Sequence, residues 1–174
     1  MSKLTPIYGL GFFFVRELGS IEQIIIFEYH DPLEEYRSII ENKHRLEDEK
    51  SMLKRNMQYF LDQETVKINN KQVYPRVIDV ELGFKGDYSY PYIMFFIKFI
   101  GEFRKGINIY EDTYEPEIAE YDYRVYWFFP SKARVISADL GVPYSLMDHG
   151  RILSFIVNKN TRTKGYEKIE FEME

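Results

Sequence analysis

Residues 11–29 read GFFFVRELGSIEQIIIFEY and predict a β-hairpin. Two apolar runs flank the pair Gly19-Ser20, and Gly followed by Ser is typical of a two-residue type II′ turn. This turn would place Leu18 opposite Ile21, so that both faces of the hairpin are apolar near its middle. A hairpin with one wet face would alternate apolar and polar residues instead. We therefore expect both faces to be covered, by a helix, by a second sheet or by another subunit.

A hairpin with two apolar faces is also a candidate interface. From Gly11 to Tyr29 there is no Pro and no Lys, the residues that commonly block unwanted pairing at a sheet edge. Two-fold dimers are the commonest oligomers, so we expect self-association or an obligate protein partner at this hairpin. The alternative is that the hairpin threads the centre of a monomeric sandwich. The expected interface residues are Phe13, Phe14, Ile24, Ile25 and Ile26.

One long helix is expected from about residue 32 to residue 61. Asp31 is a suitable N-cap, Pro32 suits the first helical position, and Glu34 would complete a capping box with Asp31. Neither Gly nor Pro occurs from Leu33 to Gln72. The apolar residues of this segment gather at its two ends. We therefore expect a helix laid across a sheet, docked at both ends, with a wet middle.

The rest of the chain, residues 64–174, is expected to be rich in β-strands. Apolar and polar residues alternate in Ala119–Phe129, as in a half-buried strand, and the very apolar segment Tyr92–Phe103 is the expected central strand. The chain is thus expected to be one mainly β (α+β) domain over residues 1–174. Its architecture would be an antiparallel β-sandwich or strongly curved sheet with an N-terminal β-hairpin (7–29) and one long α-helix (about 32–61). The alternative is a curved sheet that wraps the helix around an apolar pocket.

The composition excludes several classes of function. The chain has no Cys, which excludes disulfides, thiolate chemistry and iron–sulfur clusters. Its net charge is −5 and its positive charges are scattered, so we expect no nucleic-acid partner. The apolar stretch Leu4–Val15 is shorter than the roughly 20 residues that span a bilayer, so we expect no membrane partner. Because the absence of disulfides fits a reducing compartment, we expect a cytoplasmic location. The bias towards Ile, Lys and Glu is typical of a thermophile or of an AT-rich genome.

An acidic, tyrosine-rich segment is the first candidate binding face. It concentrates carboxylates without any Lys or Arg among them, as a site for a hard cation or for a basic partner would. Aromatic platforms for nucleic acid need a basic groove, so the acidic neighbours favour a protein or a sugar. The simpler alternative is a solvated loop that leads into a strand. The candidate residues are Tyr110, Glu111, Asp112, Tyr114, Glu115, Glu117, Glu120 and Asp122.

No set of catalytic or metal-binding residues is complete in the sequence. Glu41 and His44 form one E-x-x-H motif, but metal sites of this type need further ligands from other helices. We therefore expect no catalytic residue, no metal and no cofactor. The preferred function is a non-enzymatic protein-interaction or structural module that acts as an oligomer or as a subunit of a complex. The alternatives are a binding protein for an apolar small molecule, with a pocket inside a curved sheet, and a hydrolase with a scattered acid/base site around His149 and the acidic segment.

Overall fold

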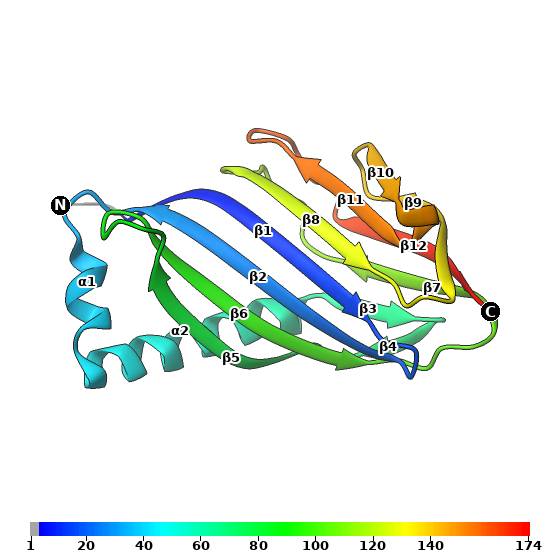
Figure 1. Cartoon of the computed structure of the whole chain (residues 1–174), viewed down its shortest axis with the longest axis horizontal. Coiled ribbons are helices and arrows are strands. Elements are labelled where there is room, and N and C mark those ends of the chain that lie inside the picture. The colour runs from blue at the N-terminus through cyan, green and yellow to red at the C-terminus, as the bar shows by residue number, and fades with distance from the viewer. Residues whose placement is uncertain (1–3) are drawn as a thin grey trace.

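The computed structural model describes residues 4–174, so residues 1–3 of the expected domain lie outside the described part. It contains two β-sheets and two helices (Figure 1). In chain order the elements are β1 (Thr5–Val15), β2 (Ser20–His30), α1 (Glu35–Ile40), α2 (Lys43–Gln63), β3 (Thr65–Ile68), β4 (Lys71–Val73), β5 (Arg76–Phe84), β6 (Pro91–Ile100), β7 (Gly106–Thr113), β8 (Asp122–Phe128), β9 (Ala133–Asp139), β10 (Tyr144–Met147), the 3₁₀ turn η1 (Asp148–Gly150), β11 (Ile152–Val157) and β12 (Tyr166–Met173).

The expected class, mainly β with an α+β composition, is confirmed. A seven-stranded sheet has the order β10-β11-β8-β1-β2-β6-β5, and a five-stranded sheet has the order β4-β3-β7-β12-β9. The strand expected at the centre, β6, is instead next to the edge, and β1 is central. Most neighbouring strands are antiparallel, but β1 pairs with β8 in parallel. Two short or polar strands, β7 and β10, were not expected from the sequence.

The β1–β2 hairpin forms, but its turn and register differ from the expected ones. The Arg16 N–H donates to Ser20 O and the Gly19 N–H donates to Arg16 O, which closes a three-residue loop rather than a two-residue one. Val15 therefore lies opposite Ile21, not Leu18. The loop requires glycine at position 19, because its φ is 95° and an added Cβ would lie 2.0 Å from the carbonyl oxygen of Gly101.

The inner face of the seven-stranded sheet carries the core. Residues Val15 and Ile21 belong to a cluster that fills the space between the two sheets and is centred on Trp127. The ring of Phe13 stacks on Trp127 with centroids 3.9 Å apart. A second cluster fills the space under the helices, where Phe95 and its neighbours on β5 and β6 meet Tyr36 and Leu61. The helices and the five-stranded sheet thus cover the same face of the larger sheet (Figure 1).

The single helix expected over about residues 32–61 is divided into two, and its first residues are not helical. Helix α1 begins at Glu35, ends at Ile40, and turns into α2 through Asn42, whose side chain caps α2 by accepting the Arg45 N–H. The two apolar ends of the predicted helix therefore lie on helices of different direction. The middle is exposed as expected, but Phe60 at the far apolar end is 62% exposed, while its neighbour Leu61 is buried.

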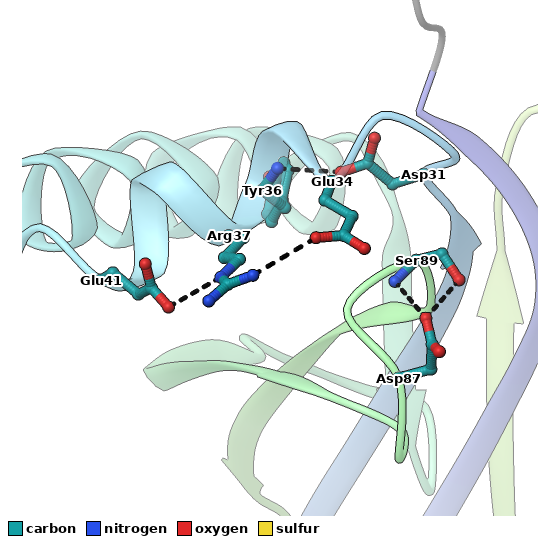
Figure 2. Close-up of polar contacts among 7 residues, drawn as sticks. All are labelled: Asp31, Glu34, Tyr36, Arg37, Glu41, Asp87 and Ser89. Carbon is teal, nitrogen blue, oxygen red and sulfur yellow. Dashed lines mark hydrogen bonds and ion pairs between the residues drawn. The ribbon is translucent and has the colours of Figure 1, made fainter.

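Asp31 has the expected role at a different place in the helix. Its carboxylate accepts the Tyr36 N–H at 2.8 Å, inside the first turn of α1 (Figure 2). Glu34 adopts a left-handed backbone and forms no capping box; its carboxylate instead pairs with Arg37. The Asp31 N–H donates to Ser89 O, so the same residue also holds the loop between β5 and β6.

We predict that Asp31→Ala lowers the free energy of unfolding by about 1–3 kcal/mol, because it leaves the buried Tyr36 N–H without its charged acceptor. Urea unfolding at fixed protein concentration measures this. Glu34→Ala is the matched control; it removes only a partly exposed ion pair and should change stability by less than about 0.5 kcal/mol. Equal effects of the two substitutions would contradict the role given to Asp31.

Candidate functional site

Three carboxylates converge inside the molecule, and we call them the carboxylate cluster: Glu64, Asp112 and Glu167. Glu64 follows the last residue of α2, Asp112 lies on β7 and Glu167 lies on β12. Strand pairing places Asp112 directly opposite Glu167. All three side chains are partly buried, and in the described part of the chain none of them forms an ion pair with a Lys or an Arg.

Tyrosines from two sheets surround the carboxylate cluster. Tyr110 acts against the rise in the pKa of Asp112, and Tyr114 acts against the rise in the pKa of Glu167. Tyr123 on β8 faces the cluster from the seven-stranded sheet, and it can approach because β1 has Gly9 at the paired position. A crevice beside Tyr123 has a volume of about 10 Å³, the size of about one water molecule.

The surroundings favour the neutral form of these carboxyl groups. Desolvation and, next, the charges of Asp112 and Glu167 raise the pKa of Glu64 to about 8. Desolvation, with the charge of Asp112, raises the pKa of Glu167 to about 8. Desolvation raises the pKa of Asp112 to about 6, against the opposing effect of the Tyr110 hydrogen bond. Strongly shifted groups that share one site are candidates for a functional role.

The structure divides the acidic, tyrosine-rich face that was expected over residues 110–122. Tyr110, Asp112 and Tyr114 point into the carboxylate cluster, whereas Glu111 lies on the opposite face of β7 and accepts a bond from Tyr166. The remaining members lie in the exposed segment before β8 or at its first residue: Glu115, Glu117, Glu120 and Asp122. These residues do not form one continuous face, because strand alternation sends neighbours to opposite sides.

Two members of the carboxylate cluster, Glu64 and Glu167, were not predicted from the sequence. A signal for Glu167 was present, since Ile169 and Phe171 point inward in β12 and the residue two positions earlier shares their face. Glu64 carries no such signal, because it lies at the junction of a helix and a strand, where neither periodicity applies.

The outer face of the seven-stranded sheet is the second candidate site. We define the outer face as the side chains that point away from the helices and from the five-stranded sheet. Neither hydrophobic cluster contains a residue of this face. Pairing across the sheet aligns apolar side chains in rows on five neighbouring strands, and one row also contains the charged Arg124, which lies between Leu10 and Ile156. The apolar side chains are Leu10, Phe12 and Phe14 on β1, Ile24 and Ile26 on β2, Met94 and Phe96 on β6, Tyr126 and Phe128 on β8, and Ile152 and Ile156 on β11.

Four aromatic rings form a continuous stack on the outer face. The Phe12 ring is 5.6 Å from Tyr126, and the Phe14 ring is 5.2 Å from Phe128, with interplanar angles of 13° in both pairs. All four side chains are partly exposed, although no charged residue separates them. The rings therefore bury one another only in part, and no described element of the chain lies over them.

Charged residues of both signs border the apolar centre of the outer face. Glu22 forms an ion pair with Arg16 at 2.8 Å, and Lys98 on the neighbouring strand lies opposite Glu22. Beside this border a depression of about 370 Å³ opens on the outer face. Its apolar lining includes Phe14, Ile24, Ile78 and Phe96, and its charged lining consists of Arg16, Glu22 and Lys98.

The five expected interface residues lie on opposite faces of the hairpin. Phe14, Ile24 and Ile26 are on the outer face, while Phe13 and Ile25 point inward and pack in the two hydrophobic clusters. The hairpin thus has two apolar faces, one covered by its own chain.

The residues expected for a hydrolase do not come together. His149 is exposed in η1, which precedes the first residue of β11, whereas the carboxylate cluster faces the other end of β11, near Val157. Five residues along a strand separate the two ends by roughly 17 Å. Within residues 4–174, no group of three His, Cys, Asp or Glu side chains is arranged to hold a metal ion. No helix in that range is long and apolar enough to cross a membrane.

Comparison with known proteins assigns no family. No family model and no curated protein matches the sequence. Among solved structures, the chain is similar to the folded domain of the LppM protein of Mycobacterium tuberculosis, with 8% identity, a TM-score of 0.44, and 99% of this chain and 93% of that chain covered. It is also similar to an aminopeptidase N family protein from Idiomarina loihiensis, with 5% identity and a TM-score of 0.43. That match covers 93% of this chain and 29% of the other, so this chain spans less than a third of that protein.

We predict that the free energy of unfolding falls by more than about 1 kcal/mol as pH rises from about 5 to about 8.5. Glu64 and Glu167 keep their protons up to a pKa of about 8 when folded but lose them near 4.5 when unfolded. Between these values the unfolded chain binds fewer protons, so stability is lost with rising pH. Urea unfolding of wild type and Glu167→Gln checks this, and the variant should show the smaller pH dependence. A wild-type stability that is constant or rises over this range would contradict the assignment.

Proposed function

We propose that this protein is a non-enzymatic association module that forms a dimer through the outer face of its seven-stranded sheet. The observation that carries the proposal is the four-ring stack of Phe12, Phe14, Tyr126 and Phe128 on a face that no described element covers. Contiguous apolar surface of this kind marks interaction sites, because its burial is the main source of association free energy.

The size of the outer face supports a second copy as the occupant. The apolar centre spans five strands at about 4.8 Å spacing and about six residues at about 3.4 Å, or on the order of 480 Å². With its charged border the face extends over all seven strands and covers roughly 900 Å². A stable interface needs about 800 Å² from each partner. Two such sheets can pack face to face about 10 Å apart, as the layers of a sandwich do.

The charge pattern also supports a second copy over other partners. The border carries Arg16 and Lys98 beside Glu22 and Glu28, so each copy offers both signs. A two-fold interface uses the same surface on both subunits and therefore needs this self-complementarity. An anionic partner would instead favour a border of one sign. The net charge of the whole chain, −5, also disfavours such a partner.

Light scattering at micromolar concentration should give twice the mass of the 21.0 kDa chain. Ile24→Glu should give a folded monomer, because it places a charge in the centre of the outer face without touching the core. Ile25→Glu, on the adjacent residue, should unfold the chain, because Ile25 packs in the cluster under the helices. Circular dichroism separates the folded variant from the unfolded one.

Ile107→Glu is the matched control for the interface. Ile107 is 41% exposed on β7 of the smaller sheet, so the same substitution there should leave both fold and dimer intact. A wild-type mass of one chain would reject self-association. A dimer that persists in folded Ile24→Glu would place the contact elsewhere on the molecule.

A second candidate function is supported by the depression near Phe96. Its volume of about 370 Å³ lies within the range of small-molecule sites, about 300–1,000 Å³. It lies on the outer face and not inside the curved sheet, where the sequence had suggested a pocket. Lys98, which forms no ion pair with any described residue, stands at its border. An apolar molecule with an anionic head, such as a fatty acid, fits this combination of lining and charge.

A fluorescent fatty acid tests the second candidate. If the depression binds such molecules, fluorescence should rise on mixing with wild type, and Lys98→Ala should weaken binding by roughly tenfold, as loss of one charge-assisted contact does. The control Lys71→Ala removes an exposed Lys of the other sheet and should bind as wild type does. Equal binding by all three proteins, or by none, would reject the candidate.

A further inference from the structure

The carboxylate cluster lies where the end of α2 meets the five-stranded sheet. Glu64 is the residue at which α2 ends and β3 begins, and its backbone N–H still donates to Leu61 O. Asp112 and Glu167 are cross-strand neighbours in the sheet that β3 joins. The cluster therefore connects the end of the long helix with three adjacent strands, and it faces the seven-stranded sheet at Tyr123.

The groups that face the cluster supply hydrogen bonds but no compensating charge. From β7 come Tyr110 and, one residue past the strand, Tyr114; from β8 comes Tyr123. Two basic residues line the crevice beside Glu167, but Lys164 is paired with Asp139, and Arg162 is exposed. The titratable and charged groups around the cluster are Tyr110, Tyr114, Glu117, Tyr121, Tyr123, Arg162 and Lys164.

One hydrogen-bond acceptor of the carboxylate cluster lacks a donor. The buried oxygen Oδ1 of Asp112 has no hydrogen-bond partner among residues 4–174. A carboxylate oxygen without a donor is costly inside a protein. Protonation lowers this cost, because a neutral carboxyl group is less costly to bury than a carboxylate and because Asp112 and the facing Glu167 then no longer repel each other.

We propose that Glu64, Asp112 and Glu167 form a proton-operated latch, which holds the end of α2 and the five-stranded sheet against β8 when protonated and opens this end of the molecule when ionised. Like charges directly opposite on neighbouring strands destabilise their pairing. Loss of the protons therefore acts on the β7–β12 pair and on the helix–strand junction first. The core around Trp127 and the sheet centre at β1 and β2 contain no member of the cluster and stay closed.

Hydrogen–deuterium exchange at about pH 6 and about pH 9 tests the latch, with rates corrected for the intrinsic pH dependence of exchange. In wild type, peptides that cover β3, the end of β7 and the start of β12 should lose protection by at least about tenfold at the higher pH. Peptides of β6 should keep theirs. The triple variant Glu64→Gln, Asp112→Asn and Glu167→Gln should keep protection at both pH values, because amides mimic the neutral carboxyl groups.

Glu111→Gln is the matched control, since Glu111 precedes Asp112 on the opposite face of the same strand and should leave the pH response unchanged. If the triple variant does not fold, Glu167→Gln alone should reduce the loss of protection. Equal protection of wild type at both pH values, or an equal loss in wild type and the amide variants, would overturn the proposal. These outcomes are independent of the dimer, because Ile24→Glu monomers contain the same cluster.

Discussion

The pairing of β1 with β2 is the constraint on which the other elements depend. With Val15 opposite Ile21, every second residue of both strands points to the side where the helices and the smaller sheet pack. A slip of one residue would move this entire set to the other side. The register is held by the loop at Gly19, where both the positive φ and the close approach of Gly101 exclude a side chain. This glycine is thus required by the loop that closes the hairpin in the observed register.

Much of the fold could be predicted because its signals are local. Alternation identified β8 as a half-buried strand, and an acceptor at Asp31 was expected near the helix start. The errors arose where a local signal depends on distant partners. Gly19-Ser20 is compatible with two loop lengths, and contact with Gly101, which lies far away in sequence, selects the longer one. No Gly or Pro marks the bend at Asn42. It lets α1 and α2, which run in different directions, pack in the same hydrophobic cluster on β5 and β6.

The candidate sites depend even more strongly on residues that are distant from one another in the sequence. A run of acidic residues was visible in the sequence, but only strand pairing brings Asp112 to Glu167, which is more than fifty positions away in the chain. Strand β7 itself was hidden, because its inward residues Asn108, Tyr110 and Asp112 are polar, whereas Ile107 on the same strand is 41% exposed. This is the inverse of the usual pattern of a half-buried strand. The outer face was partly foreseeable, since the hairpin has more apolar residues than one core can cover. That Tyr126 and Phe96 also belong to the outer face could not be predicted, because it depends on the order of the strands in the sheet.

The two sites depart from ordinary protein architecture in opposite ways. Apolar rings are left at the surface of the outer face, and carboxylates without cations are enclosed in the carboxylate cluster. Each arrangement costs free energy in the isolated, ionised chain, and natural sequences keep such conflicts mainly where function needs them. Under the two proposals, each cost is removed by a ligand that binds the folded state: a second sheet face for the rings, and a proton for the carboxylates. Since a ligand that prefers the folded chain stabilises it by mass action, the stability of this protein is expected to depend jointly on its own concentration and on pH.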